Sequence, residues 1–123
     1  MTKALRVRDY LGHILSAIER IERYTAGMNE MTFLSNELVQ DAVIRNIEII
    51  GEAANNVQRV DAEFTAKHDD IPWSVMYAMR NRVAHGYYKV DVDIVWKTIQ
   101  RDLHRLHTQI TEVRATLCRP AQP

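Results

Sequence analysis

The sequence predicts an all-α protein, an up-and-down bundle of four or five helices with a short helix before the third main one. Long segments carry apolar residues three and four positions apart, which is the spacing of one helix face. Strand-like alternation of apolar and polar residues does not extend over any useful length. Glycine and proline are few, four and three in 123 residues, so the connections between helices are expected to be short.

Length and composition fit one domain over residues 1–123, with a proline-containing tail that we expect to fray from about residue 119. Sixteen basic residues balance sixteen acidic ones, so no overall field attracts a polyanion, and RNA binding would need a local basic cluster. No stretch resembles a membrane span or a secretory signal. The lone Cys118 suits a reducing compartment. We therefore expect a cytoplasmic protein with no membrane partner.

The first helix is expected from Leu5 to about Thr25, ending near Gly27, with one apolar face made of Val7, Leu11, Ile14, Ile18 and Ile21. Residues 28–36 then form a connection with room for one short helical turn. Ser35 or Asn36 is expected to cap the next helix by accepting from its free N–H groups.

The second main helix has the same spacing, in Val39, Val43, Ile47, Ile50, Ala54 and Val57. Gly51 lies in its interior, where glycine costs about 1 kcal/mol relative to alanine. A glycine at such a position usually allows a close approach of another backbone. We interpret it as tight packing against a second helix, and a dimer contact or a ligand-facing surface is the alternative.

Residues 61–70 predict one small helix followed by a loop. The third main helix is expected from about Pro72 to Ala84, because proline suits a first helical turn, with Asp70 as its cap. Asp91 or Asp93 can cap the fourth helix. Its apolar stripe is the most regular of the chain, running through Val95, Ile99, Leu103, Leu106, Ile110, Val113 and Leu117.

The residues best suited to chemistry gather where the third helix ends, in the stretch WSVMYAMRNRVAHGYY at 73–88. Arg80, Asn81, His85 and Tyr87 lie within eight residues there, and the glycine after the histidine is a natural helix stop. This arrangement can direct a guanidinium and an imidazole into one space. A structural role is equally open, in which Arg80 pairs with a carboxylate such as Glu52 and His85 binds the last carbonyl groups of the helix.

The spacing of arginine and histidine is weak evidence by itself, because it occurs three times, at Arg8–His13, Arg80–His85 and Arg101–His107. We interpret the first and last pairs as solvated or half-buried residues on packed helices. His104 and His107 are one turn apart, but the sequence fixes no third ligand, so we expect neither a metal site nor a cofactor. The glycines are scattered singly, which argues against a phosphate-binding loop.

Four stretches together resemble the HepT toxins of the HEPN ribonuclease superfamily, which are partners of minimal nucleotidyltransferase antitoxins. They are VRDYLGHILSAIERIERYTAG, IRNIEIIGEAANNV, IPWSVMYAMRNRVAHGYYKVD and IVWKTIQRDL, and they cover most of residues 5–106. The segment RNRVAHGYY matches the family's R-N-x-x-x-H motif, with a tyrosine two residues after the histidine. The resemblance implies a HEPN-type bundle and a metal-independent endoribonuclease that has Arg80, Asn81 and His85 in its catalytic site.

The same resemblance implies a toxin of a type II/VII-like toxin–antitoxin pair. Its nucleotidyltransferase antitoxin would transfer AMP to Tyr87 and silence it. It also implies a homodimer with the active cleft along the two-fold axis, and further assembly of dimers stays open. The alternative is a non-catalytic helical accessory subunit that binds a nucleotidyltransferase, and a weaker one is a dimerising adaptor.

Overall fold

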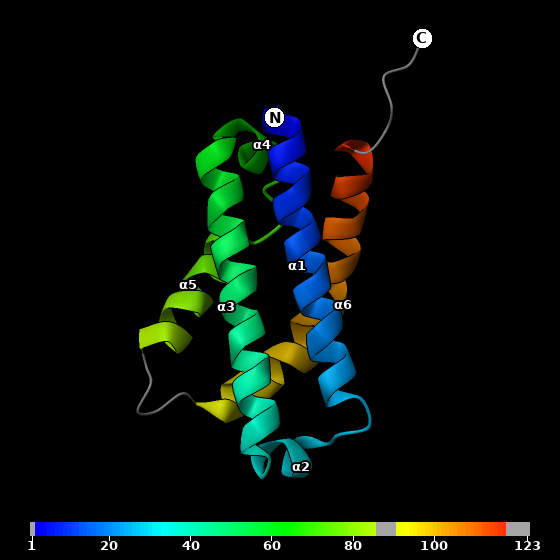
Figure 1. Cartoon of the computed structure of the whole chain (residues 1–123), viewed down its shortest axis with the longest axis vertical. Coiled ribbons are helices and arrows are strands. Elements are labelled where there is room, and N and C mark those ends of the chain that lie inside the picture. Colours follow the sequence, from blue (N-terminus) through cyan, green and yellow to red (C-terminus); the bar gives the residue numbers. More distant parts are fainter. Residues whose placement is uncertain (1, 86–90, 118–123) are drawn as a thin grey trace.

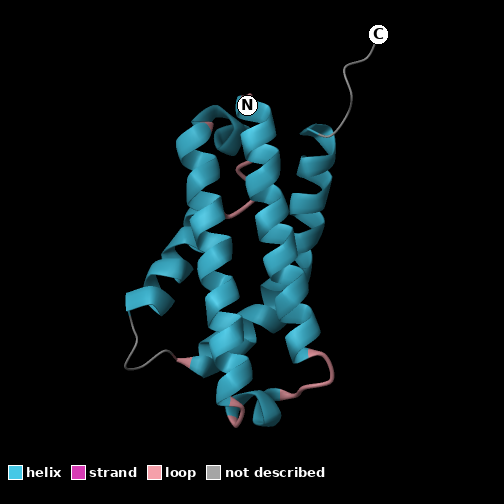
Figure 2. Ribbon diagram, in the orientation of Figure 1, coloured by secondary structure: helices cyan, strands magenta, loops and turns pink. Residues whose placement is uncertain are grey.

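The computed structural model describes residues 2–85 and 91–117, without the side chains of Ala84 and His85. The element order is α1 (Lys3–Thr25), α2 (Glu30–Leu34), α3 (Glu37–Val60), α4 (Ala62–Lys67), α5 (Trp73–His85) and α6 (Val92–Leu117). Within these ranges the regular structure is helical, without strands, which confirms the all-α prediction (Figure 2). The four or five expected helices become four long and two short ones in the described chain, because the connection after α1 also holds a helix, α2.

The long helices form an up-and-down bundle in which α1, α3 and α6 run along the long axis and α5 leans outward (Figure 1). α1 packs against α3 and α6, and α3 packs on α5. The short helices close the two ends: α2 lies at the end opposite the N-terminus, and α4 at the end where α1 begins (Figure 1). Across residues 2–85 and 91–117, none of the helices combines the length and the apolarity that crossing a membrane requires.

The predicted apolar stripes meet in one core, as the spacing requires. The five predicted core residues of α1 are buried, as are those of α3 and α6, apart from Val39 and Leu117 near the helix ends, which are half-buried. One large core residue lies outside the predicted stripe of α6. This is Trp96, whose ring packs 5.1 Å from that of Phe33, centroid to centroid. The pair fixes the short helix α2 against α6.

Two of the predicted caps are resolved to a single residue. The Asn36 side chain accepts a hydrogen bond from the Val39 N–H at 3.0 Å, whereas the Ser35 hydroxyl donates back to carbonyl groups of α2. The Asp91 carboxylate accepts from the N–H groups of Asp93 and Ile94, at 3.1 and 3.4 Å. Asn36 therefore caps α3 and Asp91 caps α6.

The start of α5 differs from the prediction. The Met76 N–H donates to the Pro72 carbonyl at 3.0 Å, and the helix begins at Trp73, so Pro72 precedes the first turn. Asp70 is too early in the chain to cap this helix, and its carbonyl oxygen instead accepts from Nε2 of Gln109 on α6 at 3.1 Å. The expectation of Asp70 as cap was wrong because the loop runs two residues further than its polar pattern indicates.

Candidate active site

Arg80 lies where α5 comes closest to α3. The facing residue is Gly51, which is buried. A Cβ atom at position 51 would overlap the Arg80 side chain and would lie 2.7 Å from the Met76 carbonyl oxygen. Any side chain there would push the helices apart. The prediction of tight helix packing at Gly51 is thus confirmed, and this packing sets the distance of Arg80 from α3.

Two polar side chains hold the Arg80 guanidinium. Its Nη2 lies 3.2 Å from Oε2 of Glu52 on α3, and its Nη1 donates to Oδ1 of Asn81 at 3.0 Å. The pairing with Glu52 that a structural role requires is therefore present. It does not consume the guanidinium, because the planar fork has further N–H donors and the side chain keeps 29% of its surface exposed. Arg80 can contact a phosphate while Glu52 and Asn81 keep it in place.

A polar cavity of about 390 Å³ adjoins Arg80. It crosses the outer face of α3 from α1 to α5, and it is lined by His13, Arg45, Glu48, Ile49, Glu52, Ala53, Asn56 and Arg80. We call it the α3 cavity. The sequence indicated only a solvated or half-buried residue at His13, but the fold brings it to the same cavity as Arg80. Its ring is edge-on to that of Tyr10, with 6.0 Å between the ring centroids. The spacing of polar residues along IRNIEIIGEAANNV could have indicated which face of α3 lines the cavity. No local signal in the sequence marks His13.

The remaining residues of the motif are placed only in part. The backbone of His85 belongs to α5, so the helix runs one residue beyond the expected end at Ala84. Arg80 and His85 are five positions apart in α5, so their α-carbons lie about 7.5 Å apart along the helix axis and about 140° apart around it. The side chain of His85 lies outside the described residues, as do Tyr87, the glycine expected to stop the helix, Cys118 and the tail expected to fray.

Of the other two arginine–histidine pairs, Arg101–His107 makes separate contacts with neighbouring carboxylates. Nε2 of His107 on α6 lies 2.9 Å from Oε2 of Glu19 on α1. Arg101 bonds the neighbouring carboxylate of Asp102 at 3.1 Å, and this hydrogen bond and charge raise the pKa of the guanidinium. His104 is exposed. In the described part of the chain, no three histidine, cysteine or acidic residues are grouped as metal ligands would be.

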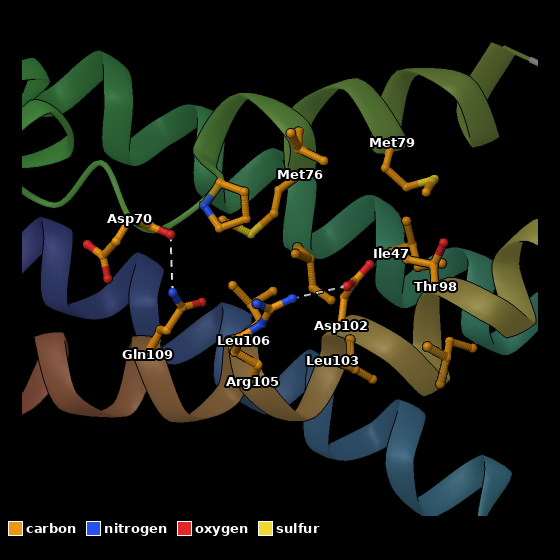
Figure 3. Close-up of a pocket in the computed structure, with 14 residues that line it drawn as sticks. Ile47, Asp70, Met76, Met79, Thr98, Asp102, Leu103, Arg105, Leu106 and Gln109 are labelled. Atoms are coloured by element: carbon orange, nitrogen blue, oxygen red, sulfur yellow. Dashed lines mark hydrogen bonds and ion pairs between the residues drawn. The ribbon is translucent and has the colours of Figure 1, made fainter.

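An apolar cavity of about 300 Å³ lies between α3, α5 and α6. Met76 and Met79 point from α5 toward α6 across it (Figure 3). Its rim is closed by an ion pair between Arg105 and Asp102 at 3.6 Å and by the Gln109 bond to the loop before α5 (Figure 3). Arg80 and Asn81 do not line this cavity. The candidate site is therefore at the polar face of α3.

Comparison of the sequence with known proteins identifies a family that it matches. The model described as "Ribonuclease HepT-like" matches residues 14–113. A Thermococcus cleftensis protein named "Probable ribonuclease HepT" is 40% identical over 87% of this chain and 94% of its own length. A provisionally named RNase of Caldanaerobacter subterraneus subsp. tengcongensis is 34% identical, over 86% of this chain and 92% of its own.

One relative is much longer. A Methanocaldococcus jannaschii protein, whose name joins a gamma-glutamylcyclotransferase to a provisional RNase, is 40% identical over 90% of this chain. The chain spans only 49% of that relative's length. No solved structure shows a significant match to the chain.

Proposed function

Because this chain belongs to the HepT-like ribonuclease family, we propose that it is an endoribonuclease that cuts RNA without a metal ion. Arg80, Asn81 and His85 form its active centre in this proposal. The observation that carries it is the placement of Arg80. Its guanidinium is held by Glu52 and Asn81 at the edge of a polar cavity, on the same helix as His85.

The chemistry needs a base, an acid and a cation. The ribose 2′-oxygen attacks the adjacent phosphorus as the base takes its proton, and the bond from phosphorus to the 5′-oxygen breaks as the acid protonates that oxygen. The products are a 2′,3′-cyclic phosphate and a 5′-hydroxyl. Histidine suits both proton transfers near neutral pH, which assigns them to His85. The Arg80 guanidinium stabilises the charge that develops on the phosphate oxygens.

A second copy of the chain completes the site in this proposal. One protomer supplies one arginine and one histidine, while the reaction uses both a base and an acid. The α-carbons of Arg80 and His85 are also about 140° apart around the helix axis, so they do not share one face of α5. A homodimer with a two-fold axis near the end of α5 would bring together two of each residue around one phosphate.

AMP transfer would regulate this site. A nucleotidyltransferase would join the Tyr87 oxygen to the α-phosphorus of ATP and release pyrophosphate. The new phosphodiester would carry a negative charge two residues from His85. It would compete with RNA for the Arg80 guanidinium. In this proposal the chain is the toxin of a toxin–antitoxin pair, and the nucleotidyltransferase is its antitoxin.

The contacts of Arg80 also support a second candidate function. The pairing of the guanidinium with Glu52 and Asn81 also fits a purely structural role, in which Arg80 joins α5 to α3 and contacts no RNA. The chain would then be a non-catalytic subunit that binds a nucleotidyltransferase. This candidate requires that His85 and Arg80 be dispensable for any action on RNA.

The test is cleavage of total RNA in EDTA by the parent protein, by His85→Ala and by Arg80→Ala. Circular dichroism and binding to the nucleotidyltransferase serve as controls for folding. We expect the parent to cut and both folded variants to be inactive while they still bind the partner. Equal cutting by His85→Ala would remove the histidine from the mechanism. An unmodified parent that binds the partner but cuts no RNA would favour the non-catalytic subunit.

A further inference from the structure

The α3 cavity has the size and the walls of a binding site. Its volume of about 390 Å³ lies in the range of roughly 300–1,000 Å³ that is usual for sites of small organic groups. Apolar surface comes from Ala53, which is buried, and from Ile49, which is half-buried. Polar side chains from three helices surround this surface, and Arg80 lies among them.

The charges of the cavity balance in pairs. Arg80 is paired with Glu52 at 3.2 Å, and Arg45 lies 3.9 Å from Glu48. A phosphate inside the cavity would approach two carboxylates, which repel it. A neutral group with several hydrogen-bonding atoms suits this lining better. A phosphate therefore fits better at the edge of the cavity, beside Arg80. The cavity itself suits the uncharged part of a nucleotide.

The polar groups match a nucleobase and its ribose. The Asn56 amide offers both donors and an acceptor, and the glutamates accept from exocyclic amines and ribose hydroxyls. The His13 ring, set against Tyr10, offers a flat face for stacking. Bases become available in this way only where the strand is single and unstacked.

We propose that the α3 cavity binds one unstacked nucleoside of a single-stranded RNA, next to the phosphate that Arg80 contacts. Asn56, Glu48 and His13 are its specificity-determining residues. The carboxylates favour a base with an exocyclic amine, so adenosine, cytidine or guanosine binds better than uridine. The role of the α3 cavity in RNA cleavage rests on the proposed ribonuclease function. RNA binding to the cavity can be measured independently of cleavage.

The first experiment measures binding. Isotope-labelled His85→Ala protein, which is expected not to cut RNA, is titrated with a short unmodified RNA, and amide chemical shifts are followed by NMR. We expect the largest shifts near His13 and along residues 45–56. Shifts confined to other surfaces would overturn the proposal. AMP is titrated in parallel, and shifts at the cavity with AMP but not with RNA would identify a mononucleotide site and also overturn it.

The second experiment measures base preference. RNAs that differ only in the nucleotide beside the cut, including an abasic one, are cleaved by the parent, Asn56→Ala and His13→Ala. The matched control is Asn55→Ala, which changes the neighbouring asparagine outside the cavity lining. We expect the parent to prefer an amino-bearing base over the abasic site by about tenfold or more in kcat/KM. Asn56→Ala and His13→Ala should lose this preference, and Asn55→Ala should keep it.

The outcomes separate the two proposals. A parent that cuts all these RNAs equally well would overturn the nucleoside site and leave the ribonuclease proposal intact. A parent that cuts none of them would overturn the ribonuclease proposal, and the NMR titration would then decide the binding site alone. If Asn56→Ala does not fold, His13→Ala carries the same test, because His13 is exposed and its replacement removes no core packing.

Discussion

The Arg80 side chain occupies the space beside Gly51 that a Cβ atom would fill. This relationship joins the packing of α3 on α5 to the position of the guanidinium, because one contact determines both. The residue after the glycine, Glu52, then reaches the same guanidinium at 3.2 Å. The segment Gly51–Glu52 therefore provides both the close approach and the charge that holds Arg80.

Replacing Gly51 by alanine is predicted to separate α5 from α3. Alanine gains about 1 kcal/mol of helix propensity, but overpacking costs typically about 1–3 kcal/mol, and here a backbone carbonyl is among the atoms met. We expect a lower free energy of unfolding in urea and reduced RNA cleavage.

The matched control is Gly12→Ala on α1. A Cβ there would lie 3.3 Å from Nη2 of Arg114, at the end of a flexible side chain that can shift. We expect the stability of this variant to change by no more than about 1 kcal/mol. Equal stability of Gly51→Ala and the parent would contradict the close approach of α3 and α5.

Glu52→Gln is predicted to lower kcat without raising KM. Loss of the carboxylate leaves Arg80 less firmly oriented, and small errors in the position of a catalytic group are costly, so kcat should fall by roughly tenfold or more. KM should stay level or fall, because a negative charge beside the phosphate is removed. Glu52 is 52% exposed, so stability should change by less than about 1 kcal/mol.

Steady-state cleavage of one defined RNA measures this split, with Glu63→Gln as the control. Glu63 is an exposed carboxylate on α4, away from the α3 cavity lining. An unchanged kcat in Glu52→Gln would show that Arg80 needs no positioning by this carboxylate.

Most of the fold was predictable because periodicity reports which face of a helix is buried. The stripes of α1, α3 and α6 identified the core nearly residue by residue. A helix of five residues repeats its apolar face barely once, so α2 was expected only as a turn. The cap of α5 was placed too early because the polar residues before it continue into a loop. Trp96 was missed because it lies beside the stripe and packs on Phe33 of α2, a contact that the periodicity of α6 does not report.

The candidate site was predictable as far as its local motif extends. Arg80, Asn81 and the carboxylate of Glu52 could be proposed from their types and positions, and the structure joins these three. His13 could not be assigned to the site, because its approach to the α3 cavity depends on how α1 crosses α3. The His107 contact with Glu19 is likewise a product of packing between distant segments.

His107 is predicted to stabilise the fold slightly and to take no part in catalysis. Its contact with Glu19 joins α6 to α1, and such partly exposed pairs contribute typically less than about 1 kcal/mol. His107→Ala and His104→Ala should therefore cut RNA in EDTA at the rate of the parent, while thermal unfolding shifts only slightly. Loss of cleavage in either folded variant would return these histidines to the list of catalytic candidates.

Tyr87 is predicted to be the residue whose modification silences the protein. When the parent is incubated with its nucleotidyltransferase and ATP, we expect the intact mass to rise by one adenylyl group and RNA cleavage to be lost. Tyr87→Phe should retain cleavage and gain no mass, since it lacks the accepting oxygen. The matched control is Tyr88→Phe, which keeps the oxygen at 87 and should respond as the parent does.

The physical basis of silencing can be tested in the same system. The added phosphodiester is expected to act by occupying Arg80, so the modified parent should bind uncleavable RNA more weakly than the unmodified parent. Undiminished RNA binding would mean that AMP blocks the chemistry of His85 instead. A Tyr87→Phe protein that is still silenced by AMP transfer would place the modification on another residue, and the proposed competition for Arg80 would then lose its basis.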